Sequence, residues 1–131
     1  MDTAKIAALE NLARRANDAN SMNDYKQGSA TNELNDLIDG ATQEAAQAME
    51  KAQTQKQKDE INEKLERYKN GLIDYFTAFY SNEAACPSVM VAGTANFPIR
   101  KKERQNARRD TLHDEYNRLD SLRHSFKGCT K

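Results

Sequence analysis

The sequence predicts an all-α fold: an elongated helical hairpin or bundle of three to four helices, with one long central helix and a structured loop at residues 82–98. Two observations support this. Apolar residues recur at spacings of three and four along most of the chain. The 131 residues include only five glycines and two prolines, which excludes a barrel or sandwich built on tight turns. In addition, no apolar run approaches the length of a membrane span.

A first helix is expected from about residue 3 to residue 20. Asp2 or Thr3 can cap its start, and an apolar stripe follows at helical spacing: Ile6, Leu9, Leu12, Ala13 and Ala16. Residues 20–30 are rich in Asn, Asp, Ser and Gly, which compete for backbone hydrogen bonds and favour a loop. Residues 1–30 therefore form an N-terminal helix and loop.

Residues 31–81 are predicted to form the long central helix, capped by Ser29 or Thr31. Two heptad stripes with spacings of four and three run along it. The first consists of Leu34, Ile38, Ala41, Ala45, Ala48 and Ala52, and the second of Ile61, Leu65, Tyr68, Leu72, Tyr75 and Phe79. Gly40 interrupts the first stripe, at a cost of about 1 kcal/mol relative to alanine. Because the polar stretch between the stripes lacks Gly and Pro, we expect one helix that bends or changes its buried face near residues 53–60, in preference to two helices.

After the loop at 82–98, which holds both prolines, a C-terminal basic helix is expected over residues 99–126, with Gly128 as its stop. The whole chain, 1–131, is then a single helical domain. We expect the last helix to lie antiparallel to residues 61–79 and the first helix to cover the alanine-rich stripe. Because small side chains let backbones approach closely, that stripe also predicts a homodimer as an alternative.

The net charge is zero but unevenly distributed. Residues 1–60 carry seven basic and eleven acidic side chains, whereas residues 99–131 carry ten and five. Two cysteines do not make a disulfide framework, and the first residues do not resemble a signal peptide. These features favour a reducing cytoplasm. Since the sequence contains no Gly-rich phosphate loop and no nucleophile–base motif, we expect a protein without enzymatic activity.

The candidate partner-binding site is the basic run at the start of the last helix. Arg100, Arg104 and Arg108 recur every four residues and form one stripe, which can bind phosphate or dock an acidic protein surface. With their neighbours they define the predicted contact set: Asn96, Phe97, Arg100, Lys101, Arg104, Gln105, Arg108 and Arg109. The alternative for the basic run is an ordinary solvated helix face. The alternative for the two residues before it is that Phe97 closes the end of the core and Asn96 caps the helix.

Two cysteines and two histidines also suggest a zinc site, with ligands drawn from Cys86, His113, His124 and Cys129. Since the histidines are eleven residues apart on one helix, about 16 Å along its axis, both cannot bind one ion while the helix is straight. One alternative is a metal site at His113 with a nearby carboxylate, Asp110 or Asp114. The other is reduced cysteines and surface histidines, with no cofactor.

Residues 86–110 carry a recognisable string. Met90, Gly93 and the run Ala95–Pro98 form the pattern Met-x-x-Gly-x-Ala-Asn-Phe-Pro, and Lys101–Glu103 with Gln105 and Asn106 continue it in the basic helix. This segment resembles one found in uncharacterised proteins of phages and integrative elements of gut bacteria. The resemblance covers about 25 residues, under a fifth of the chain.

The resemblance implies a protein of a mobile genetic element. Small proteins of such elements include inhibitors of host defence, anti-CRISPR proteins among them. The leading hypothesis is therefore an inhibitor that binds a host nucleoprotein, a type II CRISPR effector nuclease, in the bacterial cytoplasm. The alternative is a nucleic-acid-binding accessory domain of the same element, since the last helix carries excess positive charge.

Overall fold

The computed structural model describes residues 3–21, 23–86 and 98–130. In this part of the chain the fold is all-α, as predicted. Its elements are α1 (Thr3–Asn20), α2 (Ser29–Lys51), α3 (Gln55–Ala84), α5 (Ile99–His124) and the 3₁₀ helix η1 (Ser125–Thr130). No strand occurs within the described ranges.

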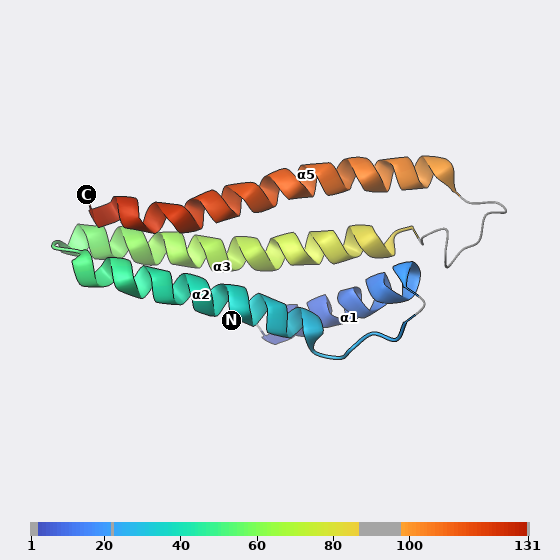
Figure 1. Cartoon of the computed structure of the whole chain (residues 1–131), viewed down its shortest axis with the longest axis horizontal. Coiled ribbons are helices and arrows are strands. Elements are labelled where there is room, and N and C mark those ends of the chain that lie inside the picture. The colour runs from blue at the N-terminus through green and yellow to red at the C-terminus, as the bar shows by residue number, and fades with distance from the viewer. Residues whose placement is uncertain (1–2, 22, 87–97, 131) are drawn as a thin grey trace.

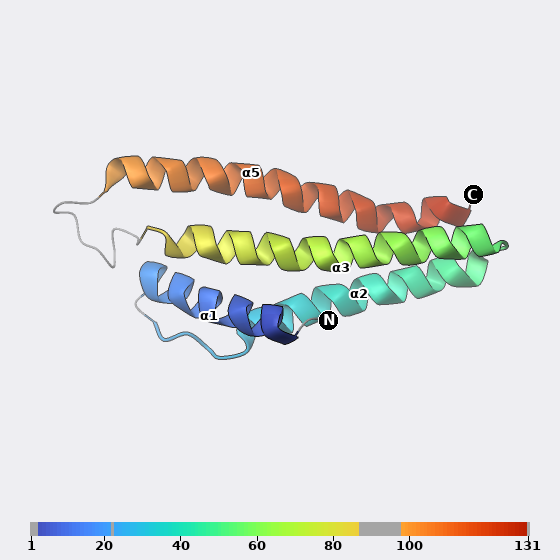
Figure 2. The ribbon, with the colours of Figure 1, turned by 180° about the vertical axis from the view of Figure 1, so that it is seen from behind.

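Helix α3 is the centre of an elongated bundle. Helix α5 runs along one side of α3 in the opposite direction, while α1 and α2 follow one another along another side (Figure 1). The view from behind shows the same order, with α5 and α1 separated by α3 (Figure 2). Each of the other helices buries its apolar face against α3.

The single central helix predicted over residues 31–81 is wrong. Helix α2 ends at Lys51, Ala52 is extended at φ −69° and ψ 130°, and the chain reverses before α3 begins at Gln55. The start of α3 is a capping box: the Thr54 side chain accepts a hydrogen bond from the Gln57 N–H at 3.1 Å, and the Gln57 side chain accepts from the Thr54 N–H at 3.2 Å. The two offset stripes therefore belong to two antiparallel helices.

The expected partner of the alanine-rich stripe is also wrong. Helix α1 packs chiefly against α3, and the Asn20 side chain donates to the Glu83 carbonyl at 2.7 Å, so both helices end at the same end of the bundle. Helix α3 and η1 cover much of the alanine stripe, and Ala41, Ala45 and Ala48 are buried there. Because these alanines are buried within one chain, the stripe is not free to bind a second copy.

The start of α2 is capped from another helix. Gly28, at φ 89°, precedes the first helical residue, and neither Ser29 nor Thr31 serves as the expected side-chain cap. Instead Glu10, from α1, accepts hydrogen bonds from the Thr31 N–H at 2.8 Å and the Thr31 hydroxyl at 2.7 Å. A carboxylate on this helix end satisfies backbone N–H groups that α2 itself leaves without partners.

The helix ends differ slightly from the predicted ones. Helix α3 continues to Ala84, into the loop predicted at 82–98, whereas residues 87–97 lie outside the described residues. Helix α5 ends at His124 and tightens into η1 without the expected stop at Gly128. Within the described ranges, no helix combines the length and apolar character needed to cross a membrane.

Candidate functional site

The basic run predicted to bind a partner occupies the first turns of α5, at the end of the bundle (Figure 1). The side chains of Arg100, Lys101 and Arg104 are exposed, and Lys102 is half-buried. Ile99, at the first position of the helix, is 66 % exposed and is the most prominent apolar side chain on the described surface. The start of the helix therefore exposes three cations and one large apolar side chain, with Lys102 half-buried beside them and the acidic Glu103 exposed among them.

Ion pairs divide the basic run into two parts. Arg109 forms a bidentate pair with Glu83 of α3, with Nε–Oε1 at 2.8 Å and Nη2–Oε2 at 3.0 Å. These hydrogen bonds raise the pKa of Arg109. Arg108 forms a looser pair with Glu115, with Nη1–Oε1 at 3.6 Å. Both arginines are thus partly engaged inside the molecule.

The remaining basic residues have no such engagement. We call Arg100, Lys101, Lys102 and Arg104 the cationic tip. Within the described residues, no acidic side chain lies within ion-pair distance of any of these four. The tip also coincides with the start of α5, where Pro98 gives no side-chain cap and the first turn holds no acidic residue. Helix-dipole and side-chain charges are therefore both positive here, an arrangement that an anionic partner stabilises.

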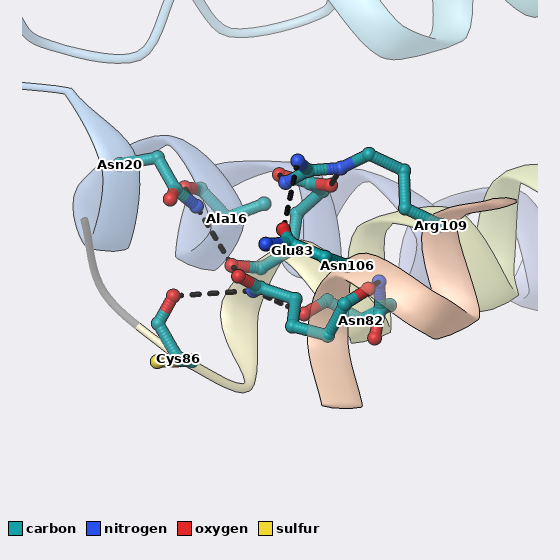
Figure 3. Close-up of polar contacts among 8 residues, drawn as sticks. Ala16, Asn20, Asn82, Glu83, Cys86, Asn106 and Arg109 are labelled. Carbon is teal, nitrogen blue, oxygen red and sulfur yellow. Dashed lines mark hydrogen bonds and ion pairs between the residues drawn. The ribbon is translucent and has the colours of Figure 1, made fainter. Parts of the chain in front are cut away.

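Gln105 holds this part of α5 against the end of α3. Its Nε2 donates to three backbone carbonyls at the C-terminal end of α3: Asn82 at 2.7 Å, Glu83 at 3.2 Å and Cys86 at 3.1 Å. The Asn82 side chain donates in return to the Gln105 carbonyl at 2.9 Å. Figure 3 shows this cluster, with Asn20 reaching it from α1 and Arg109 bridging to Glu83.

The same contacts remove Gln105 from the surface. Its side chain is 3 % exposed, and its Oε1 has no hydrogen-bond partner in the described structure. In this conformation Gln105 caps the carbonyl groups that end α3 and does not face a partner. Of the other residues in the predicted contact set, Asn96 and Phe97 lie outside the described residues.

The four candidate zinc ligands are not brought together. Cys86 is buried just beyond α3, while Cys129 is buried in η1 at the opposite end of the bundle. His113 and His124 are exposed on α5, and the His124 Nδ1 lies 2.7 Å from the Asp120 carbonyl. The described part of the chain holds no cluster of three or more His, Cys, Asp or Glu side chains suited to a metal ion.

Sequence reasoning missed two polar side chains that organise the bundle. Glu10 is 8 % exposed and caps α2, as described above. Arg123 forms a bidentate pair with Glu44 of α2, with Nε–Oε2 at 2.8 Å and Nη2–Oε1 at 2.9 Å. No short-range sequence pattern predicts the contact of Glu10 with Thr31 or that of Arg123 with Glu44, because each contact joins two different helices.

Comparison of the chain with family models, curated proteins and solved structures gives no match. We therefore take the cationic tip as the candidate functional site.

Proposed function

We propose that this chain is a non-catalytic binding protein of a mobile genetic element, which inhibits a host defence nuclease of the type II CRISPR effector class. The cationic tip of α5 is the contact site. It binds an anionic part of the nuclease or of its guide RNA and blocks that surface without chemistry.

The observation that carries this proposal is the absence of any ion pair for the four tip cations within the described chain. Charges that stabilise a fold are usually paired within it, as Arg109 and Arg123 are. Unpaired cations gathered at a helix N-terminus oppose the helix dipole, so they contribute nothing to the stability of α5. They are available to a partner, and the arginine guanidinium groups suit forked binding of carboxylate or phosphate.

The neighbouring side chains favour a protein or nucleoprotein partner. Ile99 adjoins the tip and is 66 % exposed, so it can bury apolar surface at the centre of a contact while the cations form its rim. Bare nucleic acid would use the cations and leave Ile99 in water. The resemblance of residues 86–110 to mobile-element proteins agrees with this choice.

The test is inhibition of target-DNA cleavage by a purified type II effector nuclease loaded with its guide RNA. The triple variant Arg100→Ala, Lys101→Ala, Arg104→Ala should weaken inhibition by about tenfold or more, since three partly solvated charge contacts contribute roughly 0.5 kcal/mol each. The matched control is Lys51→Ala, Lys56→Ala, Lys58→Ala, which removes the same charge from exposed positions at the other end of the bundle. It should inhibit as the parent does.

Helicity measured by circular dichroism must be equal in the two triple variants for the comparison to count. Undiminished inhibition by the tip variant would show that the cationic tip is not the contact site. If the parent chain inhibits no such nuclease but binds bare DNA with a steep salt dependence, the accessory-domain alternative replaces this proposal.

A further inference from the structure

A groove of about 700 Å³ runs between α3 and α5 and is lined by residues of these two helices. Its floor is formed by half-buried side chains of both helices, Tyr75 from α3 and Leu119 and Leu122 from α5. At its centre the two helices approach closely, because Leu119 occupies the space that a side chain at Gly71 would need. The groove thus has an apolar floor along the line where α3 meets α5.

The rim of the groove carries charges of both signs, unlike the cationic tip. On α3 the rim residues are Arg67 and Asp74, which are exposed and form no ion pair within the described residues. They are seven residues apart, so they lie on one face of α3, about 10 Å from each other along the axis. The whole lining holds three arginines, Arg67, Arg108 and Arg118, with two acids, Asp74 and Glu115, so its charge is mixed, whereas the cationic tip carries four cations.

The order of these two charges makes the α3 face complementary to itself. If a second α3 lies antiparallel on the first, with a twofold axis level with Asn70 and Gly71, Arg67 of each copy faces Asp74 of the other. A twofold interface requires this reciprocity, in which residue i meets residue j and j meets i. Ala78, on the same face, is small enough to let the two α3 helices approach, whereas the space beside Gly71 is filled by Leu119 of the same chain.

We propose that a second copy of this chain covers the groove, with α3 packed antiparallel on α3 and α5 on α5. The two α3–α5 hairpins then form a four-helix bundle whose centre is the apolar floor of both grooves. Helices α3 and α5 are 30 and 26 residues long, so a face about 40 Å long and about 20 Å wide is available. That is about the 800 Å² per partner of a standard interface. This inference does not depend on the proposed function.

The test measures the mass of the full chain by sedimentation equilibrium at concentrations from about 1 to about 100 µM, the range expected for an interface with a polar rim. The parent chain should dimerise. The single variants Arg67→Glu and Asp74→Arg each place like charges opposite one another across the twofold axis. Each should therefore raise the dimer dissociation constant by about tenfold or more.

Mixing the two single variants gives a readout that an intramolecular role cannot produce. In the mixed dimer, Glu at position 67 faces Arg at position 74, and the unchanged Arg67 faces the unchanged Asp74. An equimolar mixture should therefore dimerise close to the parent, although neither variant does so alone. The control pair Arg15→Glu and Asp18→Arg makes the same charge changes at exposed positions of α1 and should leave the parent dimer intact.

Two results would overturn the proposal. A parent chain that stays monomeric to about 100 µM leaves the groove to another occupant, such as an amphipathic helix of a different protein. A parent dimer whose strength neither variant changes, or a mixture no stronger than the single variants, would place the dimer interface on another face.

Discussion

Arg109, in the third turn of α5, and Glu83, in the last turn of α3, are joined by two parallel hydrogen bonds that are 2.8 and 3.0 Å long. The Glu83 side chain is only 15 % exposed, so its carboxylate depends on this guanidinium for much of its solvation. The pair fixes the direction in which the cationic tip leaves the bundle.

Replacing Arg109 by Lys should lower the free energy of unfolding by about 1 kcal/mol, because an ammonium group cannot reproduce the forked pair. The measurement is urea unfolding followed by circular dichroism. Arg108→Lys is the matched control, since Arg108 is 45 % exposed and its pair with Glu115 is 3.6 Å long. It should be neutral, and an equal loss in both variants would mean that the geometry of the Arg109 pair is unimportant.

The Gln105 amide offers a second, sharper prediction. Its Nε2 group faces three backbone carbonyls, so Gln105→Glu would place a carboxylate against acceptor oxygens in a buried site. The expected loss is about 3 kcal/mol at pH 7, the penalty for a buried group without a partner. That environment raises the pKa of the new carboxyl above its unfolded value of about 4.3, so the loss should shrink as the pH falls from neutral towards about 4, because a protonated carboxyl can donate to one of those carbonyls.

Gln43→Glu is the control for this variant, since it introduces the same charge at an exposed position of α2. It should change the unfolding free energy little at any pH. If Gln105→Glu behaves like Gln43→Glu, the cap on the end of α3 does not form in solution.

The surroundings of the Glu10 carboxyl lead us to expect that the free energy of unfolding depends on pH. Burial alone would raise the pKa of this carboxyl, but hydrogen bonds from Thr31, Tyr25 and Gly28 outweigh burial and lower it. A carboxyl whose pKa is lower in the folded chain stabilises the fold above its unfolded pKa of about 4.3. That stabilisation is lost as the pH falls through the folded pKa.

Glu10→Gln should therefore cost about 1–2 kcal/mol near pH 7, with a difference from the parent that narrows steadily in acid. The measurement is urea unfolding at a series of pH values. Glu33→Gln, at an exposed position one turn into α2, serves as the control. The pKa of Glu44 is also lowered, owing mainly to its hydrogen bonds with Arg123, so the parent chain loses stability in acid through this residue too. The quantity that reports on Glu10 is therefore the difference in unfolding free energy between variant and parent at each pH. A difference that is constant with pH would argue against a charged Glu10 cap.

The sequence predicts most of the helical content, because apolar periodicity is a local signal. The bounds of α1 agree with the stripe from Ile6 to Ala16. The break between α2 and α3 also had a local signal, the Thr54-x-x-Gln57 capping box. The prediction missed it because it took the lack of Gly and Pro as evidence for continuity, whereas a polar cap starts a new helix without either.

The site was less predictable, since charge in a sequence does not reveal pairing across helices. Arg104 and Arg109 belong to the same basic run, yet only Arg109 meets an acid in space. Gln105 looked like a surface amide, because the carbonyls it caps belong to residues about twenty positions earlier in the chain. Contacts at that separation depend on the register of α5 on α3, which the stripes leave undetermined.

Gly40 illustrates the same dependence. As a mid-helix glycine it should weaken α2, yet a Cβ built there would lie 2.8 Å from the Nη2 atom of Arg123. That guanidinium is held by Glu44 at 2.8 and 2.9 Å, and it cannot move aside without loosening the pair. The glycine therefore leaves room for the ion pair that joins α2 to the C-terminal part of α5.

A double-mutant cycle separates the two effects. In the parent, Gly40→Ala should change the unfolding free energy little, because the gain in helix propensity of about 1 kcal/mol is offset by displacement of Arg123. In an Arg123→Ala background, where the guanidinium is absent, the same substitution should stabilise by about 1 kcal/mol. Thermal or urea unfolding of the four proteins measures the coupling. Equal effects of Gly40→Ala in both backgrounds would mean that Arg123 does not occupy the space beside Gly40, and that the glycine is an uncompensated weakness of α2.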